Sequence, residues 1–349
     1  MRVLAAISGG VDSAVAAALA LEAGHDVVGV HLVLASAAGG SGCADSAADA
    51  EQVAAAVGIE LQVWDLSAQF TQLVMTDFLA QYAAGRTPNP CVRCNEHVKF
   101  GLLVAQAQAL GFDAVCTGHY AQVSTDGDQV VLRRAAYVPK DQSYVLAAAG
   151  PARLARVLFP LGAVTSKDEV RAMAAARGMV VADKPDSLDL CFVPDGDLRG
   201  FLRAQLGPAP GEIVEADGTV VGHHEGTYGF TIGQRRGLSI GRPAPDGRPR
   251  YVVALDPILH QVVVGPVEAL DVTTITATTP VWFTDAPVTR CLVQVRAHAD
   301  PVPAVVTPTA TTIEIHLDEP LRGVAPGQSA VGYDADRVVL QATITSTAV

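Results

Sequence analysis

The chain has 349 residues, of which 50% are hydrophobic and 17% charged, so it has ample material for folded cores and is not a disordered chain. Its net charge of −12 excludes a generally basic nucleic-acid coat protein, because non-specific affinity comes from neutralising phosphates, but leaves room for a local RNA-binding face. Six cysteines are too few for a disulfide scaffold and no apolar run is long enough for a membrane span, so we expect a cytoplasmic protein with mostly reduced thiols and no membrane partner.

The first half alternates short β-branched runs with Ala-rich helical segments. Strands are expected at residues 2–7, 25–34, 59–64 and 114–117, and helices at 12–23, 45–57, 70–84 and 100–110. This alternation predicts an α/β fold with a doubly wound parallel sheet. The Ala/Gly-rich stretch at 36–42 is expected to form a mobile loop.

The second half changes character twice. Residues 151–200 continue a helical pattern, clearest at 166–177, where Ser166 is the expected N-cap. A Gly-Pro-Ala-Pro-Gly turn then leads to short β runs, and a Thr/Val-rich tail predicts a small β-barrel. We therefore expect three domains, a nucleotide-binding domain at 1–205, a small β-rich central domain at 206–268 and a β-barrel at 269–349.

The strongest chemical signal is Ser8-Gly9-Gly10-Val11-Asp12-Ser13, between an expected strand and helix. Glycines let backbone N–H groups approach a phosphate, and a helix N-terminus adds partial positive charge. Asp12 would repel a phosphate directly, so its expected role is to hold Mg²⁺ between phosphates. The alternative is that this stretch is an ordinary strand-to-helix turn with no ligand. The hexapeptide resembles the SGGxDS loop of the PP-loop ATPases, which cleave ATP between the α and β phosphates.

A second signal is the stretch TPNPCVRCN at 87–95. Cys94 is expected just before a helix and beside Arg93, a setting that favours the thiolate. Cys91 and Cys94 form a CxxC pair, which leaves a structural zinc site open, and with Cys191 they leave open a three-thiolate iron–sulfur site.

Two further stretches carry reactive side chains. Cys191 lies in DSLDLCFV, where Asp186 and Asp189 indicate an exposed loop rather than a buried structural cysteine. TGHYA follows a predicted parallel strand, and ligands of open α/β sheets bind at the carboxyl ends of strands. Gly118 would then permit close approach of an adenine or ribose, and His119 would face the cleft.

Together these segments resemble the tRNA-specific 2-thiouridylases, which place sulfur on the wobble uridine of certain tRNAs. The matching segments, in chain order, are SGGVDS, TPNPCVRCN with KFG, TGHYA, KDQSYVL, DSLDLCFV, GFTIGQRRGL and APGQSAV. Some members of the family carry Asp where this chain has Cys91, which puts in doubt a contact between that side chain and the target base.

The resemblance implies a role for each matching residue. Cys94 would be the nucleophile, and Cys191 would carry the terminal persulfide sulfur. The residues implied in ATP binding are Ala6, Ile7, Ser8, Gly9, Gly10, Val11, Asp12, Ser13, Leu32 and Gly118. The residues implied in tRNA contact are His119, Lys140, Asp141, Gln142 and Gln328, with the helical part from about residue 151 also facing tRNA.

The implied reaction is a sulfurtransferase reaction that uses ATP and Mg²⁺. Uridine O2 would be adenylated with release of pyrophosphate, and the persulfide sulfur would then reach C2 directly or as hydrosulfide. Both routes give a transient Cys94–Cys191 disulfide. The implied partners are tRNAs for Lys, Glu and Gln, a cysteine desulfurase or sulfur relay protein as donor, and a thiol reductant. Iron–sulfur-dependent sulfide delivery, a small-molecule PP-loop ligase and a non-catalytic nucleotide-binding module remain as alternatives.

Overall fold

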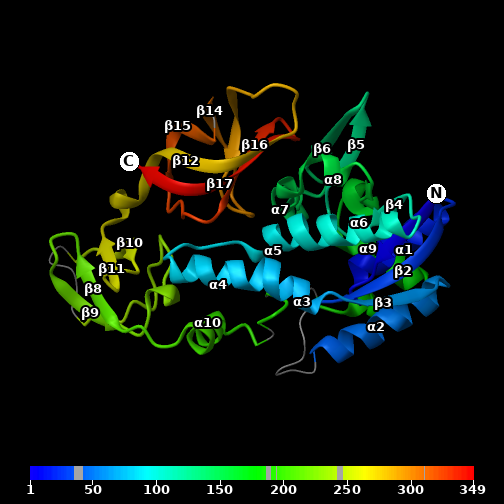
Figure 1. Ribbon diagram of the computed structural model, residues 1–349, viewed down its shortest axis with the longest axis horizontal. Helices are drawn as coiled ribbons and strands as arrows, with labels where there is room; N and C mark the ends of the chain where they lie inside the picture. Colours follow the sequence, from blue (N-terminus) through cyan, green and yellow to red (C-terminus); the bar gives the residue numbers. More distant parts are fainter. Residues whose placement is uncertain (35–41, 186–189, 194, 242–246, 310) are drawn as a thin grey trace.

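The computed structural model describes residues 1–34, 42–185, 190–193, 195–241, 247–309 and 311–349 (Figure 1). The expected loop at 36–42 therefore lies outside the described residues, apart from Gly42. Within the described residues, no helix is long and apolar enough to cross a membrane.

A five-stranded parallel sheet organises the N-terminal part. Its strand order is β3 (Leu61–Asp65), β2 (Asp26–Val33), β1 (Arg2–Ala6), β4 (Ala114–Cys116) and β7 (Val157–Leu158). The helices α1 (Val11–Glu22), α2 (Gly42–Val57) and α9 (Lys167–Ala176) follow β1, β2 and β7 along the chain. The predicted doubly wound α/β fold is confirmed. Its strand order reverses at β1, so the carboxyl ends of β1 and β4 border the crevice in which such sheets bind ligands.

Two long helical segments join the ends of the molecule. One runs through α3 (Ser67–Phe70), the π-helical turn η1 (Thr71–Met75) and α4 (Thr76–Ala83). The other runs through α5 (Pro90–Arg93), the π-helical η2 (Cys94–Leu102) and α6 (Leu103–Ala109). The second segment starts ten residues earlier than the expected 100–110, because Asn89 caps it by accepting a hydrogen bond from the Cys91 amide at 3.0 Å and a proline follows the cap.

The rest of the chain is mainly antiparallel. A four-stranded sheet has the order β10 (Tyr251–Asp256), β11 (Gln261–Gly265), β8 (Gly211–Glu215) and β9 (Val220–His224). Six strands then form a barrel in the order β12 (Asp271–Trp282), β15 (Thr312–Arg322), β14 (Val302–Pro308), β13 (Arg290–Gln294), β16 (Ser329–Asp334) and β17 (Arg337–Ala348). Pairing of β12 with β17 closes the barrel, which confirms the predicted β-barrel tail.

The hairpin β5 (Gln122–Asp126) and β6 (Gln129–Arg133) was not expected, although Asp126-Gly127 is a hairpin-turn sequence and Gly127 has φ +59°. It extends the barrel sheet by pairing Arg133 with Arg337 of β17, and Arg133 also forms an ion pair with Asp336 at 2.6 Å. The hairpin therefore fastens the α/β part to the barrel.

Short elements complete the described chain. They are η3 (Val138–Lys140), α7 (Ser143–Leu146), η4 (Ala147–Ala149), α8 (Gly150–Leu154), η5 (Pro160–Ala163), η6 (Val180–Asp183), α10 (Leu198–Leu206), η7 (Thr227–Gly229) and η8 (Val267–Leu270). The segment at 151–200, where a helical pattern was expected, thus contains β7, an edge strand too short to produce a periodic pattern.

The two long helical segments lie across the middle of the molecule, with the barrel on one side of them (Figure 1). The parallel sheet and the four-stranded sheet lie at opposite ends. The barrel is therefore placed above the helix that carries the CxxC cysteines.

Candidate active site

The Ser8–Ser13 loop connects β1 to α1 and is closed by its two serines. The Ser13 hydroxyl lies 3.1 Å from both the amide nitrogen and the hydroxyl of Ser8, and it donates to the Gly10 carbonyl at 2.9 Å. Gly9 has φ +76°, a conformation that glycine adopts without strain. Because the side chains of Ile7 and Val11 are buried in the core, only their backbone is available to a nucleotide.

Asp12 does not stand open to a metal ion. Lys167 Nζ lies 2.7 and 2.8 Å from its two carboxylate oxygens, and the Tyr120 hydroxyl donates to Oδ1 at 2.6 Å. The sequence analysis pointed to neither partner. Lys167 is the first residue of a helix that follows a parallel strand, and this position places it at the carboxyl edge of the sheet. The residues around Asp12 therefore do not fit the expected Mg²⁺ ligand role.

Gly118 packs against the start of α1. A Cβ on this residue would lie 2.6 Å from the backbone carbon of Asp12 and 2.6 Å from the amide nitrogen of Ser13. The glycine therefore makes room for the start of α1, and its expected proximity to an adenine or ribose stays a prediction. Leu32 lies near the carboxyl end of β2, partly buried between two hydrophobic clusters.

The structure brings the two cysteines of the implied reaction together. Cys94 is 7% exposed, and it belongs to the same hydrophobic cluster as Phe192 and Val193, the two residues after Cys191. Burial raises the pKa of Cys94, partly offset by the positive charge of Lys99. Cys191 is exposed as a residue, as the sequence predicted, whereas desolvation around its thiol raises its pKa to about 11 and the nearby Cys94 adds to this effect.

The expected thiolate-favouring setting of Cys94 is wrong. The helix begins at Pro90, so Cys94 lies one turn inside it and not at its N-terminus. The guanidinium of Arg93 is paired with Asp77 at 3.4 Å and with Glu96 at 3.0 Å. Both cysteines are therefore neutral thiols at pH 7.

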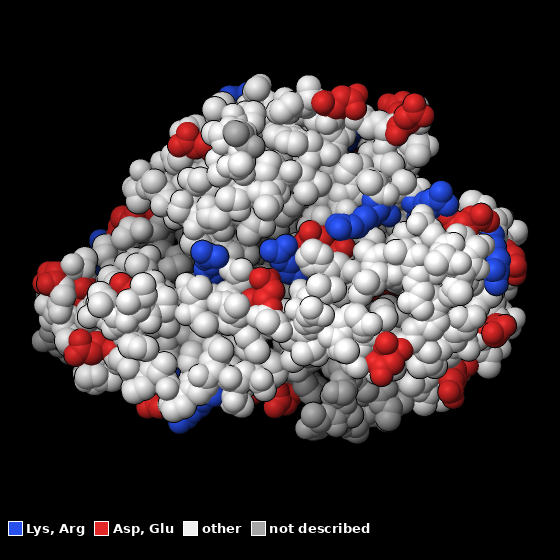
Figure 2. Space-filling view, in the orientation of Figure 1, with Lys and Arg blue, Asp and Glu red and all other residues white. Residues whose placement is uncertain are grey.

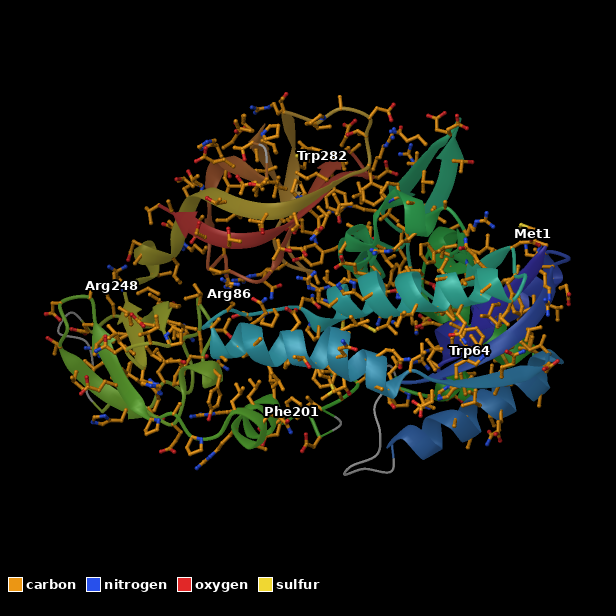
Figure 3. All side chains as sticks on the ribbon, viewed as in Figure 1. Met1, Trp64, Arg86, Phe201, Arg248 and Trp282 are labelled. Atoms are coloured by element: carbon orange, nitrogen blue, oxygen red, sulfur yellow. The ribbon has the colours of Figure 1, made fainter. Side chains whose placement is uncertain are left out.

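Phe192 anchors the segment that carries Cys191. Its ring centroid lies 5.3 Å from that of Phe78, 5.6 Å from that of Phe201 and 5.8 Å from that of Phe70. Phe78 and Phe70 belong to the first long helical segment, and Phe201, labelled in Figure 3, belongs to α10. Asp186 and Asp189 lie outside the described residues, as does the side chain of Cys43.

The charge of Lys99 acts on both cysteines and on His119. It lowers the pKa values of Cys94 and Cys191. Burial, with a smaller contribution from Lys99, holds the pKa of His119 well below its usual range, so this imidazole is neutral. His119 follows Gly118 directly and its Nδ1 lies 2.7 Å from the Thr117 hydroxyl.

Two side chains of the KDQSYVL segment hold it in place through hydrogen bonds and an ion pair. Asp141 accepts hydrogen bonds from the Ala135 amide at 2.9 Å and the Ser143 hydroxyl at 2.7 Å, and it pairs with Arg134 at 3.4 Å. The side-chain oxygen of Gln142 accepts from the Tyr120 amide at 2.9 Å. Lys140 ends η3 in the same segment. Asp141 and Gln142 thus shape this segment.

Three of the matching motifs meet beneath the barrel. Gln328 donates to the Thr87 carbonyl, the Tyr144 hydroxyl donates to the Ser329 carbonyl at 2.9 Å, and Asn95 donates to the Val145 carbonyl at 3.1 Å. A cavity of about 150 Å³ lies at this junction, with walls from both the cysteine helix and the barrel. Its lining residues include Asn89, Arg93, Gly327 and Gln341.

The iron–sulfur alternative is not supported by the arrangement of side chains. Cys91 is close enough to raise the pKa values of Cys94 and Cys191 slightly. Among the residues that the structure describes, however, no three His, Cys, Asp or Glu side chains are grouped to hold a metal ion. The same finding leaves the structural zinc site without support.

Known proteins resemble this chain over nearly its whole length. A family model described as the tRNA methyl transferase HUP domain matches residues 1–195, and its PRC-barrel and aminomethyltransferase β-barrel companions match 199–266 and 272–344. The tRNA-specific 2-thiouridylase MnmA of Beutenbergia cavernae is 55% identical over 99% of this chain and 95% of that protein. The chain belongs to the tRNA-specific 2-thiouridylase family. Relatives with the same name from Acidothermus cellulolyticus and Streptomyces avermitilis are each 54% identical over 99% of this chain.

A more distant likeness exists among solved structures. A 4-thiouridine synthetase in complex with RNA and ATP is 19% identical, covers 58% of this chain and 50% of that one, and has a TM-score of 0.38. A likeness at this level carries no argument about the chemistry of the 2-thiouridylase family.

Proposed function

We propose that this protein is an ATP-dependent sulfurtransferase that converts the wobble uridine of tRNA to 2-thiouridine. The observation that supports the proposal is that Cys191, nearly a hundred residues from Cys94 in the sequence, lies near enough to Cys94 for the two thiols to influence each other, with Phe192 and Val193 packed in the cluster that contains Cys94. A small-molecule ligase that uses the same loop needs neither cysteine.

The reaction begins with attack of uridine O2 on the α-phosphorus of ATP, which releases pyrophosphate. O2 is a poor leaving group by itself, and adenylation converts it into the oxygen of AMP. Backbone N–H groups at the N-terminus of α1 are the expected donors to the phosphates, since charge that develops there meets preorganised dipoles. Ala6 to Ser13 are assigned to ATP in this proposal, with Leu32 and Gly118 shaping the edge of the crevice.

Sulfur transfer follows from a persulfide on Cys191. Its terminal sulfur attacks C2 and AMP leaves; the Cys94 thiolate then attacks Sγ of Cys191, which frees 2-thiouridine and leaves a Cys94–Cys191 disulfide. In the second route Cys94 attacks first, and the released hydrosulfide adds to C2. Both routes consume two electrons from a thiol reductant in each turnover. The charge of Lys99 assists the step in either route, because Cys94 must lose a proton that its burial otherwise retains.

The tRNA surface is assigned to the junction between the barrel and the long helices. On the face shown in Figure 2, several Lys and Arg side chains lie along this junction, and Figure 3 places Arg86 there. Lys140, Gln328 and the neutral His119 are the proposed contacts, while Asp141 and Gln142 hold their own segment in shape. We assign tRNAs for Lys, Glu and Gln as substrates, with a cysteine desulfurase or relay protein as the donor in the cytoplasm.

Domain boundaries at 1–205, 206–268 and 269–349 are part of the same proposal. The first unit is not fully separate from the third, because the β5–β6 hairpin belongs to the α/β part of the chain and pairs with the barrel. We expect the first and third units to unfold together for this reason.

The test is 2-thiouridine formation in unmodified tRNA with ATP, Mg²⁺ and a sulfur source, scored by mercury-gel shift. Wild type is expected to shift the tRNA, Cys94→Ser and Cys191→Ser are expected to fail, and Cys291→Ala, a buried barrel cysteine, serves as the matched control. Cys91→Ser is expected to remain active. If the wild type hydrolyses ATP to AMP but forms no thiouridine, the ATP-site assignment stands and the assignment of tRNA uridine as the substrate is refuted.

A further inference from the structure

The nucleotide loop contains no basic residue of its own, since Ser8–Ser13 lacks the lysine that ends a Walker loop. The structure supplies one from 155 positions away. Lys167 Nζ contacts both carboxylate oxygens of Asp12, and the Lys167 side chain is only 12% exposed. A second lysine also reaches the loop, because Lys184 Nζ lies 3.1 Å from the Gly9 carbonyl and is paired with Asp49.

The position of Lys167 is unfavourable for its own helix. It is the first residue of α9, after the cap in which Ser166 accepts from the Glu169 amide at 3.1 Å, and a cation at this end opposes the helix dipole. A partly buried ion pair also costs desolvation of both groups. Helix stability therefore does not explain a lysine at this position, whereas a site for anions does.

Several sources of positive potential meet at this point. The N-termini of α1 and α9 both lie here, since Asp12 is the second residue of α1 and Lys167 the first of α9. Lys184 adds a second ammonium group. Asp12 and Asp49 each hold one lysine in place, so that an arriving polyphosphate meets cations already oriented toward the loop.

We propose that Lys167 is a further catalytic residue of this enzyme, whose ammonium group binds the pyrophosphate that leaves ATP, with Asp12 and Tyr120 as its positioning residues. This inference rests on the proposed ATP cleavage. As O2 of uridine bonds to the α-phosphorus, the bond from that phosphorus to the bridging oxygen breaks and the electron pair leaves with pyrophosphate. Lys167 donates a hydrogen bond to this oxygen anion and keeps its proton, so no co-reactant is needed.

The expected size of the effect follows from similar donors elsewhere. Removal of one preorganised donor to a developing anion lowers kcat by about 10²–10³-fold. Lys167→Met keeps most of the aliphatic chain and removes the charge, so this loss is expected in tRNA-dependent pyrophosphate release. The KM for tRNA is expected to change by less than about threefold, because the Lys167 side chain is only 12% exposed and is held against Asp12 rather than on the surface.

The chain provides a matched control for a purely structural role. Arg177, the C-cap residue of α9, forms an ion pair with Glu22 of α1 at 2.7 Å, so it ties the same two helices together at their other ends. Arg177→Met removes this tie without touching the loop. If Lys167 only fastened α9 to α1, the two variants would behave alike.

The decisive measurement is the affinity of inorganic pyrophosphate for the full chain by calorimetry, combined with kcat for tRNA-dependent pyrophosphate release. We expect Lys167→Met to weaken pyrophosphate binding at least tenfold and Arg177→Met to leave it within twofold. Lys167→Arg, which keeps the charge and protects against a folding failure, is expected to bind pyrophosphate within about threefold of wild type and to lose about tenfold in kcat.

Each outcome decides one question. Equal pyrophosphate affinity in wild type and Lys167→Met, or equal losses in Lys167→Met and Arg177→Met, would overturn the role of Lys167. A wild type that binds no pyrophosphate would also overturn it. If the wild type binds pyrophosphate through Lys167 but forms no thiouridine, the proposed function is refuted and the role of Lys167 in pyrophosphate binding stands.

Discussion

We expect the approach of Cys191 to Cys94 to depend on the aromatic side chain of Phe192, and Phe192→Ala is the sharpest test of this arrangement. Phe192 is 9% exposed, packs edge-on against Phe70 and Phe78 and lies tilted against Phe201, at 5.3–5.8 Å between centroids. Truncation of a buried Phe to Ala costs about 3–5 kcal/mol. Because every ~1.4 kcal/mol is tenfold in an equilibrium, about 3 kcal/mol shifts the docked population by about 10²-fold.

We take the lower end of this range because Val193, which is 2% exposed, also holds the segment. The assay measures the equilibrium constant for formation of the Cys94–Cys191 disulfide from the two thiols with oxidised glutathione. This constant gives the effective concentration of the Cys191 thiol near the Cys94 thiol. Phe192→Ala is expected to lower this concentration about 10²-fold. Phe192→Leu keeps most of the apolar contact and is expected to lower it tenfold or less.

Phe112→Ala provides the control for general destabilisation, since Phe112 is 3% exposed and belongs to a different core cluster. In the Phe112→Ala variant, the effective concentration of the Cys191 thiol at Cys94 is expected to match that of wild type. The reasoning is refuted if folded Phe192→Ala retains the wild-type effective concentration, because Cys191 would then be positioned by something other than the aromatic cluster.

Three further predictions follow from single contacts. Gly118→Ala forces its Cβ to within 2.6 Å of the α1 backbone, so ATP affinity by calorimetry should fall at least tenfold, and a Kd within twofold of wild type contradicts the packing argument. The thiolate fraction of Cys191 grows as pH rises toward its pKa of about 11, so iodoacetamide alkylation resolved by peptide mass should accelerate about tenfold per pH unit from 7 to 9; a plateau near pH 8 excludes the raised pKa. Tyr144→Phe leaves the Ser329 carbonyl without its donor, which costs about 1 kcal/mol, so the KM for tRNA should rise about fivefold while ATP affinity stays constant; an unchanged KM uncouples this contact from Gln328.

Local patterns were sufficient for much of this fold. The alternation of β-branched runs and Ala-rich helices predicted the parallel sheet, and the Thr/Val alternation predicted the barrel, because each pattern records which face of one element is buried. The π-helical stretch at Cys94–Leu102 and the two-residue strand β7 were missed, since neither has a periodicity of its own.

Some features of the candidate site could likewise be predicted from local sequence, whereas others depend on the tertiary structure. The sequence by itself determined the loop at Ser8–Ser13, because glycine geometry belongs to the residues themselves. The roles of Cys94 and Cys191 are implied by the resemblance to the 2-thiouridylases and stay predictions. Only the tertiary structure decided that Lys167 reaches Asp12, that Gly118 makes room for α1 and that Phe192 delivers Cys191 to Cys94. These pairs are separated by about a hundred residues or more in the chain, and their contacts arise from the packing of whole helices and sheets, which no local window of sequence encodes.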